Sequence, residues 1–456
     1  MAANVPVSEK EKMSTMTDDY SLSRVPAEGK TPMWKVLMVQ IGGFVALSQF
    51  MLGAELGYGM PFWDAIIATT LGSTLLEFIA FGLGVAGQRE GLSTSLLSKW
   101  AGFGTLGSAI VGLTFAISLI GWFGIQNSIF AQGIISLLGG HINFALVATI
   151  TGLVVTASVL FGFKGLSWTS NISVPAFIIV IGLATYNMLK GHTMTALITM
   201  AAPGTALTMS AAVTMVTGNF IIGAIIMPDL NRFNHNAKDV FMVSVVGTLI
   251  GELGVNVLGV LMAHAVGSQQ IMPIIYQLTG GFGILLVIFS SVKVNDLNLY
   301  SATLDFANFF KQVFHWNLNR GMITIVAGVL GTFLSVIGLI DQFSGFLNTL
   351  GVVFPPIASI MFIDYWVLKR SRKQLDESRA KGELPEKSEV FHPVTIVAWV
   401  VGSAVGFFVN WGISSLNVLV VSGLVYFIGM KIFDKQPQET VITETAPDKE
   451  KEEDDA

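Results

Sequence analysis

Residues 104–138 read GTLGSAIVGLTFAISLIGWFGIQNSIFAQGIISLL, and none of them carries a charge. A helix needs about 20 consecutive apolar residues to cross the hydrocarbon core of a bilayer. Similar stretches fill almost all of the remaining chain, which makes twelve in total. Lipid offers the backbone no hydrogen-bond partners, and these stretches are too long for barrel strands. We therefore predict an all-α membrane protein with twelve transmembrane helices.

The predicted spans share a high apolar content and are separated by polar loops. They are 35–60, 64–87, 104–138, 144–163, 168–189, 206–228, 239–267, 279–309, 321–339, 343–368, 391–411 and 414–434. Of the 456 residues, 52% are hydrophobic and 12% are charged, against about 25% charged in soluble domains. This composition leaves no room for a separate soluble domain.

Lysine and arginine gather in every second predicted loop, as the positive-inside rule requires when both termini are cytoplasmic. Lys190 is the exception among the outer loops. We expect a multi-pass protein of the plasma membrane, which in a bacterium is the inner membrane. The expected parts are a cytoplasmic N-terminal tail (1–34), a first repeat of five spans (35–189), a second repeat (206–368), two further spans (391–434) and an acidic, disordered cytoplasmic tail (435–456).

Two of the spans are interrupted by glycine. The first contains a Gly-Gly pair between Gln40 and Gln49, and the sixth reads Thr217-Gly-Asn-Phe-Ile-Ile-Gly223. They lie five spans apart, and a repeat with an odd number of helices is inverted in the membrane. Paired glycine-broken segments in two halves mark transporter sites, so we predict broken helices here. The alternative is that these glycines only let helices pack closely.

Polar side chains at membrane depth identify candidate site residues. In span 3, Trp122 and Gln126 are four residues apart and share one helix face, where an aromatic ring and an amide suit a flat heterocycle. The alternative is a packing tryptophan and an interhelical hydrogen bond.

Span 8 contains Lys293-Val-Asn295-Asp296-Leu-Asn298. A charge at the bilayer centre costs at least roughly 2.5–3.5 kcal/mol, so such residues face protein or a cavity rather than lipid. We expect Asn295 and Asn298, which share a face, to recognise substrate. Asp296 points elsewhere, and we expect it to bond backbone amides at a helix break or to assist coupling.

Three further carboxylates fall within predicted spans, namely Glu55, Glu77 and Glu252. Each is interpreted as a proton carrier, a partner of Lys293 or a neutral acid in a helix contact, and these alternatives stay open. The sequence contains no phosphate-binding glycine loop, no metal-ligand spacing, no cysteine and no paired nucleophile and base. We therefore expect no enzyme activity, cofactor, metal site or nucleic-acid partner.

Short motifs in a fixed order carry a resemblance to a known family. They are Gly121-Trp-Phe-Gly124, Val174-Pro-Ala176, Gly218-Asn-Phe220, Asp229-Leu-Asn-Arg-Phe233, Asn236-Ala-Lys238, Asn295-Asp296, Leu299-Tyr300, Phe306-Ala-Asn308, Pro355-Pro356 and Asp364-Tyr365. With these the chain resembles the nucleobase:cation symporter-1 family. The resemblance implies a leucine-transporter-type fold, with a five-plus-five inverted repeat and two extra C-terminal helices.

The resemblance also implies where substrate binds. A nucleobase is expected between Trp122 and Phe220, read by Asn295 and by the breaks of spans 1 and 6. Gln126 is similar to a substrate-contacting glutamine of hydantoin transporters in the family. The predicted site further includes four polar residues of these spans, namely Ser118, Gln49, Asn219 and Asn298.

Two departures from the family pattern affect function. Cytosine permeases carry a glutamine where this chain has Ser118, which leaves the substrate open between cytosine and another pyrimidine or purine. They also carry two sodium-binding threonines where this chain has Lys293 and Val294. Valine offers no ligand oxygen, and an ammonium group repels Na⁺.

We therefore expect an importer of a nucleobase that works by alternating access with H⁺ rather than Na⁺ as the coupling cation. Lys293 could gain and lose a proton as the cavity opens to each side, with Glu77 or Glu252 as its partner. A permanently charged Lys293 would instead leave a sodium-independent facilitator or exchanger. Allantoin, a hydantoin or a thiamine-precursor pyrimidine are alternative substrates.

Overall fold

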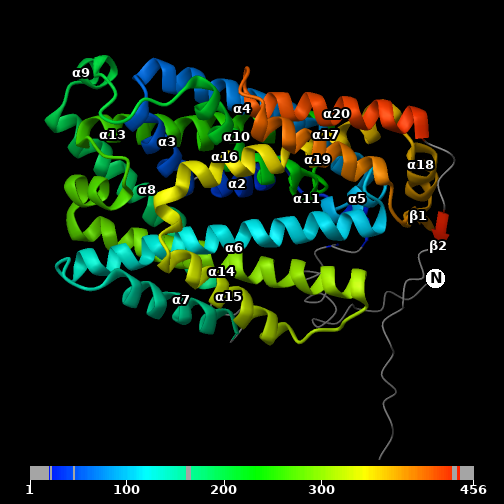
Figure 1. Ribbon diagram of the computed structural model, residues 1–456, viewed down its shortest axis with the longest axis horizontal. Coiled ribbons are helices and arrows are strands. Elements are labelled where there is room, and N and C mark those ends of the chain that lie inside the picture. The colour runs from blue at the N-terminus through cyan, green and yellow to red at the C-terminus, as the bar shows by residue number, and fades with distance from the viewer. Residues whose placement is uncertain (1–19, 21–22, 45–46, 161–165, 434–438, 442–456) are drawn as a thin grey trace, which may run out of the picture.

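Long helices run side by side along the long axis of the molecule (Figure 1). The computed structural model describes residues 20, 23–44, 47–160, 166–433 and 439–441. Most of the predicted acidic tail lies outside these residues. Strands β1 (Lys387–Glu389) and β2 (Glu439–Val441) form one short antiparallel pair. They lie with α18 at one end of the molecule, while α9 lies at the opposite end (Figure 1).

The first half of the chain contains the helices that correspond to the first five predicted spans. They are α2 (Met33–Phe44), α3 (Leu47–Gly59), α4 (Phe62–Glu90), α6 (Gly104–Leu137), α7 (Phe144–Leu160) and α8 (Leu166–Gly191). Three short helices connect or precede them, namely η1 (Ala27–Gly29), α5 (Thr94–Lys99) and α9 (Met194–Thr199).

The second half is less regular. Its helices are α10 (Met209–Ile225), α11 (Met227–Asn231), α12 (Ala237–Gly247), the π-helix η2 (Thr248–Gly254), α13 (Val255–Val266), α14 (Ile271–Phe314), α15 (Arg320–Val336), η3 (Leu339–Gln342), α16 (Phe343–Val353), α17 (Pro355–Phe362), the π-helix η4 (Ile363–Leu368), α18 (Arg372–Lys381), α19 (Pro393–Phe408) and α20 (Ser414–Phe433). Helix α14 kinks at Gly280, whose backbone is not helical.

Helix length and composition support a membrane-embedded protein. Among the described residues, five helical stretches are long and apolar enough to cross a bilayer, and a sixth qualifies if the bent α14 is one span. The outer surface is apolar: Phe408 is 83% exposed and Phe78 67% exposed, as expected for side chains that face lipid. An all-helical membrane protein is thus confirmed, while the count of twelve spans and the inverted repeat remain predictions.

Close helix contacts depend on small residues. An added Cβ at Gly53 of α3 would lie 2.4 Å from the backbone oxygen of Asn256 in α13, and one at Gly218 of α10 would lie 1.8 Å from that of Leu347 in α16. In lipid, helices associate largely through such close packing.

The predicted break within span 6 is wrong in its position. Helix α10 continues through Gly218 and Gly223, and the turn comes at Ile226, just before Pro228. Because Gly218 admits α16, its role in this structure is the packing role that we weighed as the alternative. In span 1, α2 ends at Phe44 and α3 begins at Leu47, and the residues between them lie outside the described part.

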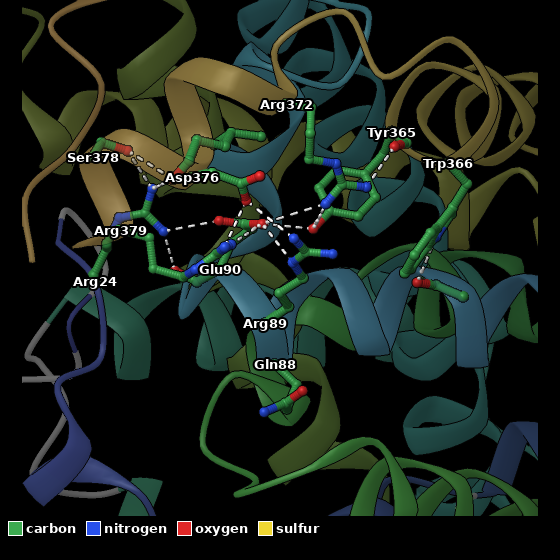
Figure 2. A network of polar contacts seen from close by, with 12 residues as sticks. Arg24, Gln88, Arg89, Glu90, Tyr365, Trp366, Arg372, Asp376, Ser378 and Arg379 are labelled. Atoms are coloured by element: carbon green, nitrogen blue, oxygen red, sulfur yellow. Dashed lines mark hydrogen bonds and ion pairs between the residues drawn. The ribbon is translucent and has the colours of Figure 1, made fainter.

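A buried carboxylate organises the α18 end of the molecule (Figure 2). Glu90, at the end of α4, is 1% exposed. Its oxygens lie 2.7 Å from Nη1 of Arg379 and 3.2 Å from Nη1 of Arg24, and they accept a 2.6 Å hydrogen bond from Tyr365. This network joins the N-terminal segment, α4, η4 and α18 (Figure 2).

Lys30 makes a second connection at this end. Its Nζ donates to the backbone oxygens of Gln88, at 3.2 Å, and Arg232, at 2.6 Å. Burial lowers the pKa of the Lys30 ammonium to about 8. Segments far apart in the sequence are therefore fixed together beside the helix ends.

Candidate functional site

One face of α6 carries three of the predicted substrate residues. Ser118, Trp122 and Gln126 follow one another at intervals of four, and Ser118 and Gln126 are 4% and 2% exposed. Two turns beyond Gln126, Gly133 packs against Ile288 of α14. The two helices run in opposite directions. Moving two turns from Gly133 back to Gln126 on α6, and two turns from Ile288 forward to Asn295 on α14, therefore reaches the same level along the helix axes. Gln126 therefore lies at the level of Asn295.

The aromatic residues of the predicted site converge on α16. The Trp122 ring meets Phe346 edge to face at 5.2 Å between centroids and Phe343 at 6.2 Å. Phe220 packs against the same hydrophobic cluster as Trp122 and Phe346, and Gly218, two residues earlier, contacts α16 directly. Trp122 and Phe220 thus pack against the same hydrophobic cluster, and the proposed stacking of a substrate ring between them remains a prediction.

A chain of amides joins three helices beside this region. Nδ2 of Asn219 in α10 donates to Oε1 of Gln49 in α3 at 2.6 Å. Nε2 of Gln49 in turn donates to Oδ1 of Asn256 in α13 at 2.9 Å. The chain leaves Oδ1 of Asn219 and Nδ2 of Asn256 without a partner at its two ends.

Several unpartnered polar atoms lie on α6, α10 and α14. In the described part of the chain, buried side-chain atoms without a hydrogen-bond partner include Ser118 Oγ, Gln126 Oε1, Asn219 Oδ1, Ser291 Oγ and both amide atoms of Asn295. Buried polar atoms are normally satisfied, because leaving one unpaired costs roughly 1–3 kcal/mol. These acceptors and donors can instead pair with the edges of a flat polar ligand.

Other polar residues of the same helices are structural. Asn127 is fully buried; its amide donates to the backbone oxygen of Ala148 at 2.8 Å and accepts from Thr151 at 2.8 Å. Asp296 accepts a 2.5 Å hydrogen bond from Ser158 of α7. Our expectation that Asp296 would bond backbone amides at a helix break was wrong, because α14 is continuous there.

Lys293 and Asn298 are both partly buried. No carboxylate among the described residues pairs with Lys293. The pairing with Glu77 or Glu252 that we expect in one state of the transport cycle is not formed in this structure and stays a prediction. Glu77 instead accepts a 2.7 Å hydrogen bond from Thr248, which lies one turn before Glu252 in the same helix.

The sequence reasoning missed Asn256 and Ser291. Each is fully buried within a predicted span and carries an unpartnered polar atom. The signal was present for Asn256, since an asparagine in an apolar stretch must find a partner. Its partner Gln49 is remote in sequence, so only the packing of α3 on α13 identifies the pair.

Comparisons with known proteins agree with this arrangement. Residues 24–429 match the family model described as permease for cytosine/purines, uracil, thiamine, allantoin. The cytosine permease of Escherichia coli (strain K12) is 26% identical over 424 residues, which cover 92% of this chain and 96% of the relative. The hydantoin permease of Microbacterium maritypicum is 23% identical, covering 77% and 75% of the two chains.

The fold is similar to that of a solved transporter, Mhp1. In its inward-facing conformation the TM-score is 0.76 with 19% identity, and 90% of this chain and 93% of that chain are covered. A closed conformation of Mhp1, a nucleobase-cation-symport-1 family transporter with bromovinylhydantoin bound, gives a TM-score of 0.70 with 18% identity over 90% and 95% of the chains. These likenesses confirm the fold, and the family predicted from the motifs is confirmed by the family model that matches residues 24–429.

Proposed function

Because the chain belongs to the family of permeases for cytosine/purines, uracil, thiamine and allantoin, we propose that it is a secondary active transporter that imports a nucleobase. The observation that supports this best is the set of unpartnered amide and hydroxyl atoms on α6, α10 and α14. Trp122 and Phe220, which pack against the same hydrophobic cluster, would stack on the ring. No paired nucleophile and base accompanies these atoms, and the relatives are permeases.

Asn295 is the proposed reader of the substrate edge. Both of its amide atoms are unpartnered, so it offers one acceptor and two donor hydrogens, which suits a pyrimidine or purine edge. Gln126, at the same level on α6, would read a second edge. Ser118, Gln49, Asn219 and Asn298 complete the proposed site. The relatives named as cytosine and hydantoin permeases support cytosine or another nucleobase first and a hydantoin or allantoin second.

The proposed transport cycle uses twelve spans, with both termini cytoplasmic. The bundle would consist of α2–α4 and α10–α13, and the scaffold of α6, α7, α14 and α15. Rocking of the bundle against the scaffold would open the site alternately to each side. The pattern of lysine and arginine in the loops supports this orientation.

Sodium is not the proposed coupling ion. Lys293 and Val294 stand where sodium-binding threonines are expected from the family, and the partly buried ammonium of Lys293 would repel a second cation. We propose coupling to H⁺, with a sodium-independent facilitator or exchanger as the alternative.

A ligand screen tests the function. The purified protein would be heated with cytosine, uracil, hypoxanthine, allantoin and a hydantoin, each with and without Na⁺. We expect stabilisation by at least one of these heterocycles that does not depend on Na⁺. The corresponding radiolabelled compound should then enter proteoliposomes. If none of the compounds stabilises the protein or enters the vesicles, the proposed function is wrong.

A further inference from the structure

Two carboxyl groups meet in the middle of the membrane-embedded region, outside the substrate site. Glu77 lies near the midpoint of α4, and Glu252 lies near the midpoint of the helical stretch Ala237–Val266. Thr248 donates a hydrogen bond to Glu77, and Glu252 follows Thr248 by about one turn of the same helix, so the two carboxyl groups are neighbours. Both are therefore about as far from either aqueous phase as their helices allow.

Hydroxyl groups surround this pair. Thr248 donates to Oε2 of Glu77 at 2.7 Å. Ser73 is placed to donate to Glu252, and Ser244 to Glu77. Both serines are more than nine-tenths buried. The polar groups around the two carboxyls in the described part of the chain are therefore neutral hydroxyls.

The pair has no cationic partner. Within the described ranges, neither Glu77 nor Glu252 takes part in an ion pair with lysine or arginine. Helices α10 and α17, which pack on α4, contain no titratable residue. On the other elements packed against α4 or η2, and on α4 itself, the titratable residues lie nearer to a helix end: Lys35, Glu55, Tyr58, Asp64, Arg89, Glu90, Lys99, Asp229, Lys238, Asp239 and His264.

An apolar groove of about 410 Å³ lies over Glu77. Its lining includes Phe78, Phe241 and Leu249, which are 67%, 50% and 56% exposed on the lipid-facing surface. Two carboxylate charges without a counterion are strongly disfavoured in such surroundings. A proton removes one of the charges and needs no ligand cage, so it fits this site better than a metal ion does.

The backbone at the pair is also irregular. Thr248 and Glu252 both belong to the π-helix η2, and π-helical turns are rare and are frequently found at functional sites. Four residues after Glu252 comes Asn256, the end of the amide chain that runs through Gln49 to Asn219. The carboxyl pair and the amide chain are therefore about one helical turn apart on the same helical stretch.

We infer that Glu77 and Glu252 form the proton site of the transporter. This inference rests on the proposed function. One proton from the outer solution binds to one of the two carboxyls, which then donates a hydrogen bond to the other carboxylate. The proton is later released to the inner solution. No covalent bond of the substrate changes in this cycle. After release, the hydroxyls of Ser73 and Ser244 and the free amide hydrogens of Asn256 are the donors available to both carboxylates. Movement of Asn256 would then shift Gln49 and Asn219.

The test compares accumulation with exchange in proteoliposomes. Wild type, Glu77→Gln, Glu252→Gln and Glu252→Asp are assayed with tritiated cytosine, uracil and hypoxanthine. Glu55→Gln serves as the matched control, because Glu55 is a partly buried carboxyl in α3 that accepts from Ser344 and lies outside the pair. A gradient of two pH units, acid outside, can drive about 100-fold accumulation by one-for-one symport. Counterflow from preloaded vesicles reports binding and folding without a net proton movement.

We expect wild type, Glu55→Gln and Glu252→Asp to accumulate substrate, and the two glutamine variants to show counterflow without accumulation. Normal accumulation in both glutamine variants would overturn the inference. Loss of both counterflow and accumulation in these variants would also overturn it, because that result is expected if the pair is purely structural. Accumulation driven by a Na⁺ gradient, or lost only in Lys293→Ala, would overturn it too. If wild type transports none of these three compounds, allantoin and a hydantoin are assayed in the same way, and a wild type that transports none of the five would refute the proposed function itself.

Discussion

Replacement of Asn295 by leucine should stabilise the free protein and abolish substrate binding. Asn295 is 1% exposed, and neither amide atom has a hydrogen-bond partner among the described residues. Leaving a buried polar group unpaired costs roughly 1–3 kcal/mol, whereas an apolar side chain of similar size bears no such cost. Asn295→Leu should therefore raise the free energy of unfolding by about 1–3 kcal/mol. The same substitution removes the groups proposed to bind substrate, which corresponds to roughly a 5- to 150-fold loss of affinity.

Asn127→Leu is the matched control, since it is the same substitution in a neighbouring helix. Asn127 is fully buried, but both of its amide atoms are bonded, to Ala148 and Thr151. This substitution should lower the melting temperature. Both variants would be measured by thermal unfolding in detergent, with and without the stabilising heterocycle. A lower melting temperature in Asn295→Leu, with the ligand-induced shift retained, would refute the reasoning.

Four further predictions follow from single contacts. Trp122→Ala should weaken substrate binding roughly tenfold to a hundredfold, because stacking on an aromatic is worth about 1–3 kcal/mol per base; an unchanged affinity in uptake assays would contradict stacking. Because Lys293 stands where a sodium ion is expected in the family, substrate uptake should not respond to an inward Na⁺ gradient. Strong stimulation of uptake by such a gradient would contradict this prediction. Glu90→Gln should lower the melting temperature, because breaking a buried ion pair costs about 3–5 kcal/mol. Burial lowers the pKa of Lys30 to about 8 in the folded protein, against about 10.4 unfolded. The folded state therefore loses this proton first, and the melting temperature of wild type relative to Lys30→Met should rise between pH 8 and 10.

The sequence was sufficient for the membrane class, the family and the position of most helices. Long uncharged stretches such as 104–138 can satisfy their backbone in lipid only as helices. It was not sufficient for the shape of the helices. Gly218 looked like a break, yet α10 runs straight through it, because the space left by the missing side chain is filled by the α16 backbone. The π-helix at Thr248–Gly254 and the kink at Gly280 depend on neighbouring helices and gave no comparable signal.

Site residues were predicted where spacing alone places them together. Trp122 and Gln126 share a face because they lie four apart on one helix. Partners on different helices were harder, because no spacing relates Gln49 to Asn256 or Glu77 to Glu252. The sequence predicts that Glu77 or Glu252 pairs with Lys293 in one state of the transport cycle, and this stays a prediction, because no spacing relates these residues and the pair is not formed in this structure.

Whether a buried amide is structural or binds a ligand depends on the neighbouring helix that packs against it. Asn127 and Asn295 are the same residue type, both buried at membrane depth, and no local pattern separates them. Helix α7 presents the backbone oxygen of Ala148 and the hydroxyl of Thr151 to Asn127, which turns it into a helix contact. Asn295 meets no such groups among the described residues. Because an unpaired buried amide lowers stability, it is expected to persist where a ligand uses it. The same reasoning applies to Glu252, a buried carboxyl without a cationic partner among the described residues. In our proposal, the amide chain from Asn256 through Gln49 to Asn219 would couple this carboxyl to the substrate site.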